Sequence, residues 1–346
     1  MELNRRVVIY LICIICVISC QSKERQVETS FYYWKQQFAI NNAEQIYLND
    51  LKVKKIYIKF FDINKNNDTQ QTEMIAPVYF AQQPAEDINI IPTVFITNKT
   101  LIHSSLSEIS GLVDYIYNNI QTILKKNEIT NVKTIQIDCD WSLSTKEKYF
   151  KLLSLLKNKM QHQELSATIR LHQIKFHSKT GIPPVDRGTL MFYNMDDVTA
   201  DSTENSILDL SVAKQYFYNF DTYTLPLDVA LPLFRWGVLI RRGRVIQLLN
   251  HLMSKDLDPN RFQELKKNQY QVLESHYFKG YYLYKGDKIR LENVPLEDLI
   301  QASKLLETHI KRDTLLNLTY YHLDSLALQH YSVEDVKNIS KEFKKH

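Results

Sequence analysis

Segments with the pattern of buried β-strands alternate with segments of helical periodicity through most of this chain. The strand-like runs span residues 54–62, 90–97, 133–140, 165–172, 188–194, 227–234 and 315–321. Apolar residues with helical spacing lie between or after them, at residues 106–125, from 144 onward, and at 207–217, 296–310 and 332–343. Such an alternation predicts an α/β fold built on a parallel sheet.

The last third of the chain is less regular. Residues 238–249, around an Arg-Gly pair, and residues 281–291, around a Gly-Asp pair, have the pattern of β-hairpins. Their second strands belong either to the main sheet or to excursions from it. About eight strands with intervening helices predict a (β/α)8 TIM-like barrel with hairpin excursions in the C-terminal third. A doubly wound open sheet is the main alternative.

Several predicted strands have one apolar and one partly polar face. Along residues 133–140, apolar side chains alternate with Gln136, Asp138 and Asp140, and residues 165–172 alternate in the same way. Because successive strand side chains point to opposite faces, the polar ones share a single face. A sheet covered by helices on both sides needs two apolar faces, whereas a barrel can turn the polar face into its lumen. The pattern favours the barrel.

The C-terminal ends of the predicted strands carry carboxylates, aromatic rings and amides, the groups that bind sugars. In barrel enzymes the chemistry lies at this end. Asp140 and Asp138 are therefore the candidate catalytic residues. The candidate ligand-binding residues are Asp62, Trp141, His172, Tyr193, Asn194, Arg235, Trp236, Glu292, Tyr321 and Asp324.

Asp138 and Asp140 have alternative roles. Two side chains on one strand face lie about 6.6 Å apart, a separation that glycosidase carboxylates use, but both would stand on one wall of the barrel. A pair formed by Asp140 and a carboxylate of another strand suits the geometry better. For Asp138 the alternative is a buried ion network with Lys59 and Arg170, since buried charges are usually paired. The tryptophans, similarly, have the alternative of packing in the core.

The first twenty residues have the pattern of an export signal. Arg5 and Arg6 precede an apolar run over residues 7–18, about half the length that a membrane-spanning helix needs. The segment 17–20 (VISC) resembles the lipobox of bacterial lipoproteins, which implies lipidation of Cys20. We therefore expect a signal peptide over 1–19, the lipidated cysteine with a flexible tether over 20–29, and a single barrel domain over 30–346.

Two further resemblances concern the barrel. The runs 137–141 (IDCDW) and 191–194 (MFYN) are similar to strand motifs of chitinase-like glycoside hydrolases. The runs 31–34 (FYYW), 56–62 (IYIKFFD) and 136–140 (QIDCD) resemble a family of uncharacterised TIM-barrel lipoproteins, found especially in Bacteroidetes. The hydrolase motif continues Asp-x-Asp-x-Glu, with the glutamate as general acid. Here Ser142 stands at that place, and a serine cannot protonate a leaving oxygen as a carboxylic acid does.

Composition excludes several other classes of function. Three of the four cysteines lie in the first twenty residues, so Cys139 alone remains and no disulfide framework is expected. Neither a cysteine-based zinc site nor a glycine-rich nucleotide loop is present, and His172 has no second histidine at ligand spacing. We expect no metal and no cofactor. A net charge of +4 without a basic stripe argues against a nucleic-acid partner.

These observations predict a lipoprotein of the bacterial cell envelope that binds or processes carbohydrate. Its expected partners are the membrane, through Cys20, and a glycan. Gln21 after the cysteine resembles the sorting pattern for the outer membrane. The alternative is a non-catalytic structural or assembly lipoprotein that binds another envelope protein. Whether the chain is an enzyme stays open at this point, because this barrel supports many chemistries.

Overall fold

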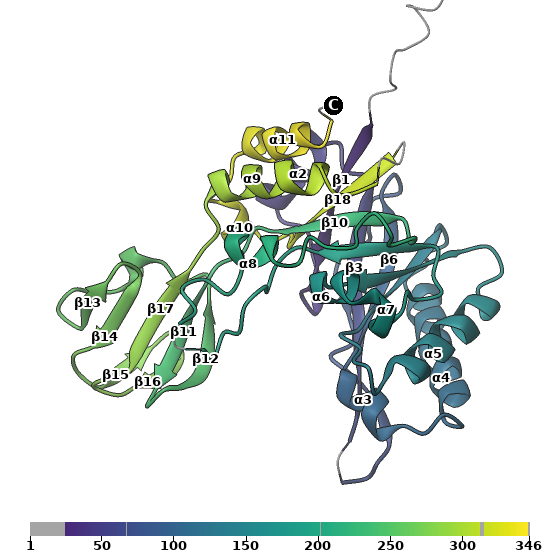
Figure 1. The fold of residues 1–346 in the computed structure, drawn as a ribbon, viewed down its shortest axis with the longest axis horizontal. Helices are drawn as coiled ribbons and strands as arrows, with labels where there is room; N and C mark the ends of the chain where they lie inside the picture. Colours follow the sequence, from purple (N-terminus) through teal and green to yellow (C-terminus); the bar gives the residue numbers. More distant parts are fainter. Residues whose placement is uncertain (1–24, 67, 201, 312–314, 345–346) are drawn as a thin grey trace, which may run out of the picture.

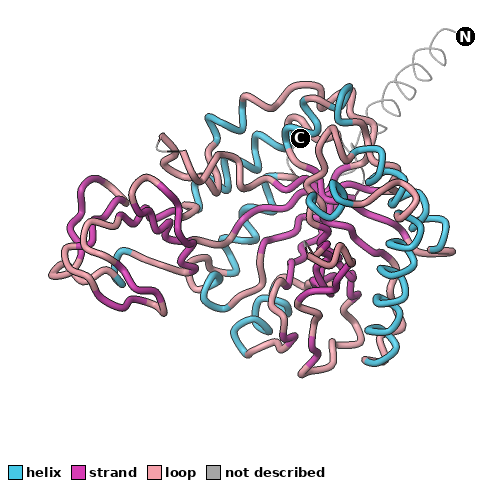
Figure 2. The backbone as a smooth tube through the Cα atoms, turned by 90° about the horizontal axis from the view of Figure 1, so that it is seen from below, coloured by secondary structure: helices cyan, strands magenta, loops and turns pink. Residues whose placement is uncertain are grey.

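The computed structural model describes residues 25–66, 68–200, 202–311 and 315–344. Within these ranges, eight parallel strands form a closed barrel with helices on its outside (Figure 1, Figure 2). Strand β1 closes the barrel by pairing with both β3 and β18. In order around the barrel, the strands are β1 (Gln26–Tyr33), β3 (Lys55–Lys65), β6 (Asn89–Ile96), β7 (Thr134–Asp138), β8 (Glu164–Ile169), β9 (Arg187–Met191), β10 (Leu227–Pro232) and β18 (Leu315–Tyr321). The prediction of a (β/α)8 barrel is confirmed.

Strand β1 is the barrel strand that the sequence patterns did not indicate. Residues 26–29, expected in the flexible tether, pair instead with residues 315–318 of β18. Three of these four side chains are polar, and none of the four is fully buried, so they lack the apolar alternation of the other strands. The backbone is nevertheless required there, because its hydrogen bonds join the two edges of the sheet. Cys20 and the predicted signal peptide lie outside the described residues.

The longer helices cover the outside of the barrel, and each buries an apolar face. In α4, for example, Ile109, Val113, Ile116 and Ile120 are fully or almost fully buried. The helices are α2 (Asn42–Asp50), α3 (Asn98–His103), α4 (Ile109–Lys126), α5 (Lys146–Lys159), α6 (Leu171–Lys175), α7 (His177–Thr180), α8 (Leu210–Lys214), α9 (Leu296–Glu307), α10 (Ser325–Leu328), α11 (Val333–Glu342) and the 3-10 turn η1 (Ser254–Asp256). Among those described, none has the length and apolar character needed to cross a membrane.

Both predicted hairpin segments lie in an insert between β10 and α9, apart from the barrel sheet. Residues 238–249 form the predicted hairpin, whereas residues 281–291 do not, because 281–283 pair with 276–278 and 288–292 pair with 236–240 and 269–271. Figure 1 shows this insert projecting to one side. It has its own small core, which includes Leu239, Leu249, Val272 and Ile289. Its strands are β11 (Trp236–Arg241), β12 (Arg244–Asn250), β13 (Phe262–Lys266), β14 (Gln269–Val272), β15 (His276–Phe278), β16 (Tyr281–Leu283) and β17 (Lys288–Glu292). The short strands β2 (Gln37–Phe38), β4 (Thr72–Ile75) and β5 (Tyr79–Phe80) lie beside the barrel.

Polar side chains fill the lumen of the barrel, as the strand faces predicted. The amide of Gln136 is fully buried and donates to the hydroxyls of Ser166, at 3.2 Å, and Thr189, at 3.0 Å. Its oxygen accepts a hydrogen bond from the Tyr32 hydroxyl at 2.7 Å. Because these four buried side chains are hydrogen-bonded to one another, the network fixes the relative positions of β1, β7, β8 and β9 below the open end of the barrel.

Candidate functional site

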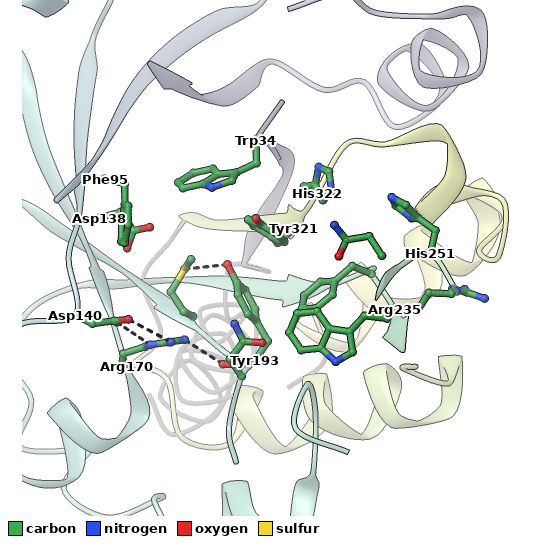
Figure 3. Close-up of a pocket in the computed structure, with 15 residues that line it drawn as sticks. Trp34, Phe95, Asp138, Asp140, Arg170, Tyr193, Arg235, His251, Tyr321 and His322 are labelled. Atoms are coloured by element: carbon green, nitrogen blue, oxygen red, sulfur yellow. Dashed lines mark hydrogen bonds and ion pairs between the residues drawn. The ribbon is translucent and has the colours of Figure 1, made fainter. Parts of the chain in front are cut away.

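A cavity of about 290 Å³ opens at the C-terminal ends of the barrel strands, next to the insert. Figure 3 shows Asp138 at one end of it, Arg235 and His251 at the other, and Trp34 and Tyr321 between them. The cavity is lined by Trp34, Phe95, Asp138, Asp140, Arg170, Met191, Tyr193, Asn194, Phe234, Arg235, Trp236, Asn250, His251, Tyr321 and His322. The predicted site residues Asp138, Asp140, Tyr193, Asn194, Arg235, Trp236 and Tyr321 are among them.

Asp138, the last residue of β7, is the carboxylate that the barrel holds most deeply in this cavity. The hydroxyl of Thr168 donates to its Oδ1 atom at 2.7 Å. Burial raises the pKa of Asp138 to about 6; the Thr168 hydrogen bond acts against this shift, and the charge of Asp140 adds to it. This side chain therefore changes between hydrogen-bond donor and pure acceptor just below neutral pH.

Asp140 is held by an arginine. The Nε atom of Arg170 lies 2.8 Å from Oδ1 of Asp140, and its Nη2 atom lies 3.4 Å from Oδ2. The Nη1 atom of Arg170 also donates to the carbonyl of Tyr193 at 3.2 Å. Lys59, the other cation considered for Asp138, contacts Asp62 instead, with its Nζ atom 3.1 Å from Oδ2. Lys59 and Arg170 thus form two separate ion pairs, with Asp62 and Asp140, and the buried network predicted for Asp138 is not formed. Asp138 has no cation in direct contact among the described residues.

Aromatic rings form the walls between the two ends of the cavity. Tyr321, which ends β18, lies 5.7 Å from Trp34 and 5.4 Å from Tyr193 between ring centroids. Phe234 contacts both Tyr321, at 5.6 Å, and Trp236, at 5.0 Å. Faces of this kind pack against the C–H groups of a sugar ring. Of the tryptophans, Trp34 and Trp236 are only partly buried and line the cavity.

The far end of the cavity is built partly by the insert. Asn250 ends β12, and His251 follows it. His322 follows β18, and burial lowers its pKa to about 4 against the opposing charge of Asp324, so its ring is neutral at pH 7. Arg235 is almost fully buried, and its Nε atom has no hydrogen-bond partner among the described residues. Several polar donors are thus gathered at this end.

Trp141 and Glu292 correct the predicted binding set, because neither lines the cavity. The Trp141 ring is buried, stacks on Tyr149 at 5.1 Å and donates to the carbonyl of Thr180. It follows β7 by several residues and therefore turns outward, toward the helices. Glu292 is 1% exposed, and both of its carboxylate oxygens accept hydrogen bonds. The strand that carries it belongs to the insert, so the strand-end argument did not apply to it.

Asp62, His172 and Asp324 lie close to the cavity but are not part of its lining. Asp62 is engaged by Lys59. His172 lies in α6 and lines a smaller neighbouring pocket. Asp324 caps α10 through the backbone amide of Leu326 and forms an ion pair with a lysine. These three side chains support the rim of the site rather than its interior.

The sequence patterns missed several lining residues. Trp34 and Met191 belong to runs that resemble known families, but neither was predicted as a site residue. Asn250 and His251 come from the second strand of a hairpin, and no strand-end rule for a barrel points to such a place. Phe95, Phe234 and His322 have no distinctive spacing. Their positions follow only from the closed barrel and the path of the insert.

Ser142 occupies the position of the general acid in the hydrolase motif, but its side chain points toward the residues that precede α5. Its hydroxyl lies 2.9 Å from that of Ser144, and its backbone amide donates to the Thr145 hydroxyl at 2.9 Å. It does not line the cavity. Among the described side chains, no three His, Cys, Asp or Glu residues come together in a way that could hold a metal ion.

No family model matches this chain, and no curated protein matches it by sequence. Solved structures do match its fold. The spore cortex-lytic enzyme SleL of Bacillus cereus has a TM-score of 0.55 at 13% identity, over 93% of this chain and 76% of that chain. A class V chitinase of Nicotiana tobaccum has 0.53 at 10%, over 93% and 99%, and has also been solved as a mutant in complex with NAG4. A Chromobacterium violaceum chitinase has 0.52 at 12%, over 90% and 98%. At these identities the chain shares the barrel fold of chitinase-like glycoside hydrolases.

Proposed function

We propose that this protein binds a glycan in the cavity at the C-terminal ends of the barrel strands and does not hydrolyse it. The observation that carries the proposal is the combination of an aromatic wall with a single deep carboxylate, Asp138. Aromatic faces and a carboxylate that accepts hydroxyl hydrogen bonds are sufficient for sugar binding. The chitinase-like neighbours, one of them in complex with NAG4, support glycans that contain N-acetylglucosamine as the first ligands to test.

The absence of hydrolysis follows from the carboxylates. Most glycosidases need two carboxyl groups on opposite sides of the scissile bond, and substrate-assisted ones still need one carboxylic acid beside the leaving oxygen, which in the chitinase-like motif is the glutamate. Among the described residues that line the cavity, Asp140 forms an ion pair with Arg170, and Asp138 has no second carboxylate opposite it. Ser142 replaces the glutamate of the hydrolase motif and faces α5. The same cavity is therefore suited to hold a sugar without cleaving it.

Removal of the Trp34 ring tests the binding site. We expect Trp34→Ala to weaken the affinity for NAG4, or for the glycan that binds best on an array, by about tenfold, because one sugar ring loses the indole ring on which it stacks. Titration calorimetry on the full chain in mild detergent measures the change. Tyr277→Ala is the matched control, since this ring is 76% exposed on the insert, outside the cavity lining. If no glycan binds the wild-type protein, the proposal is wrong and the protein-partner alternative gains support. Release of shorter sugars from NAG4 would instead contradict the non-hydrolytic part.

We also propose that Cys20 carries a lipid that attaches the barrel to the bacterial cell envelope, with delivery to the outer membrane. The proposal rests on the charged, apolar and small residues that precede this cysteine. Cells grown with a clickable fatty acid should label the wild-type protein, and Cys20→Ser should remove the label. Cys139→Ser is the control, because that thiol is buried in the barrel. Equal labelling of the Cys20→Ser variant would rule out the lipid site.

A further inference from the structure

The opposite end of the barrel carries a basic groove of about 570 Å³ that the glycan proposal does not use. It lies between the starts of β1 and β3 and the helix α11. In Figure 1, β1 and α11 lie at the top of the molecule, where the described chain begins. Six lysines line it, and we call them the lysine face: Lys52, Lys54, Lys55, Lys337, Lys341 and Lys344.

The lysine face has a surplus of positive charge. The only carboxylates that line the same groove among the described residues are Glu28 and Asp50. Glu28 is occupied by Lys55, whose Nζ atom lies 2.8 Å from Oε2. Lys54 and Lys341 have carboxylate partners at the edge, Asp87 and Glu334. The remaining lysines are exposed and form no ion pair with the described residues; they are Lys52, Lys337 and Lys344.

The helix presents its lysines in one row. Lys337, Lys341 and Lys344 are spaced by four and three residues, which places them on the same side of α11 and the turn after it. The opposite side packs into the barrel through Val336, Ile339 and other apolar residues. The row therefore projects away from the protein core, and nothing in the packing of α11 requires it to be basic.

The start of the described chain lies beside the lysine face, and this places the predicted lipid anchor near it. Arg25 is fixed by Glu307, at 2.8 Å, and by the carbonyl of Lys311, at 2.6 Å, and Gln26, the next residue, lines the groove. Arg25 follows Cys20 by five positions, a stretch of chain that reaches at most about 18 Å. A lipid on Cys20 would thus keep this end of the barrel next to the bilayer, while the candidate glycan cavity opens at the other end.

We propose that the lysine face docks on the anionic phospholipid headgroups of the membrane and so turns the glycan cavity away from the bilayer. Lysines within about a Debye length of an anionic surface are attracted to it, and several act together. The proposal uses the Cys20 anchor only to explain why the face is near a membrane. It does not depend on glycan binding.

Lysine footprinting on vesicles tests this orientation with the full chain. The protein attaches to vesicles of either composition through the apolar segment 7–18 or through a lipid on Cys20. The protein is reconstituted on phosphatidylcholine vesicles with and without phosphatidylglycerol, and lysine acylation is followed by mass spectrometry. At low salt, phosphatidylglycerol should slow the labelling of Lys52, Lys337 and Lys344 by about fivefold. Lys267 and Lys285, exposed on the insert, should react equally on both vesicles. High salt should abolish the difference.

Two double variants complete the test. Lys337→Glu with Lys344→Glu should remove the phosphatidylglycerol-dependent protection of Lys52, whereas Lys267→Glu with Lys285→Glu should leave it unchanged. Equal labelling of the lysine face on both kinds of vesicle would overturn the proposal. The same protection produced by inorganic phosphate on pure phosphatidylcholine would also overturn it, because the groove would then be a phosphate site rather than a membrane-docking face. The fatty-acid labelling of Cys20 is read separately, so failure of the anchor and failure of the lysine face are distinguishable.

Discussion

Glu292→Ala is expected to lower the free energy of unfolding of the insert by about 3–5 kcal/mol, because it removes one partner of a buried ion pair. The Oε1 atom of Glu292 lies 2.7 Å from Arg290, and its Oε2 atom accepts from the Ser206 hydroxyl at 2.6 Å and from Nε1 of Trp236 at 2.8 Å. Arg290 also donates to the carbonyl of Val198. This cluster joins the insert to the loop that follows β9, so its loss leaves a buried arginine and an unpaired indole.

Hydrogen exchange followed by mass spectrometry measures this effect locally. Protection of β11 and β17 should fall strongly in Glu292→Ala, while protection of the barrel strands changes little. Glu297→Ala, an exposed glutamate at the start of α9, is the control and should leave both regions unchanged. If the two variants lose the same protection, the cluster is not what attaches the insert. Since Trp236 lines the cavity, Glu292→Ala should also weaken glycan binding.

The barrel was largely predictable because its strands follow a local rule. Runs of buried residues mark seven of its strands, and the alternation along residues 133–140 correctly assigns Gln136 and Asp138 to the lumen. Strand β1 does not follow this rule, since residues 26–29 are mostly polar and none of them is fully buried, although their backbone pairs with β18. Closure of a barrel is a long-range requirement, and a short polar segment that supplies it carries no local pattern.

The candidate site was predictable only in part, for a similar reason. Knowledge that strand ends converge was sufficient to bring together Asp138, Tyr193 and Tyr321, which end or closely follow three different strands. It was not sufficient for Asn250 and His251, because the path of the insert back to the barrel mouth depends on its own core. Trp141 shows the opposite error: adjacency in sequence to a strand end does not decide which way a side chain turns.

The pH dependence of the free energy of unfolding tests the contribution of the buried Asp138 carboxyl. Its pKa of about 6 in the folded protein lies above the ordinary value of 3.8, so the folded state retains the proton to higher pH than the unfolded state. Stability should therefore fall as the pH rises from about 4 to about 6 and stay reduced above that window. Asp138→Asn lacks this penalty. Allowing for solvent in the cavity, we expect the variant to be about 1–3 kcal/mol more stable than the wild type at pH 7.5 and equal to it at pH 4.

Urea unfolding of both proteins across this pH range measures the difference, and Asp186→Asn provides a control of opposite sign. Burial would raise the pKa of Asp186, but hydrogen bonds from Lys157 and the amide of Leu165 outweigh it and hold the pKa below its ordinary value. Asp186→Asn should therefore be less stable than the wild type at neutral pH, with a difference that shrinks in acid. A variant at position 138 that shows the same trend as Asp186→Asn would contradict the burial of Asp138.

The same Asp138→Asn change should weaken glycan affinity by about 10–100-fold at pH 7.5, because a charged hydrogen-bond acceptor is replaced by a neutral amide. The wild-type affinity should fall toward that of the variant as the pH drops below about 6, where the carboxyl is protonated, whereas the affinity of the variant should stay constant. Calorimetric titrations at several pH values test both statements. If Asp138→Asn gains stability and loses glycan affinity, the wild-type carboxylate serves ligand binding and not the stability of the fold. That result distinguishes a binding residue from a buried charge without a function. If Asp138→Asn binds as the wild type does at every pH, Asp138 does not contact the glycan, and the site must lie among the polar groups at the other end of the cavity.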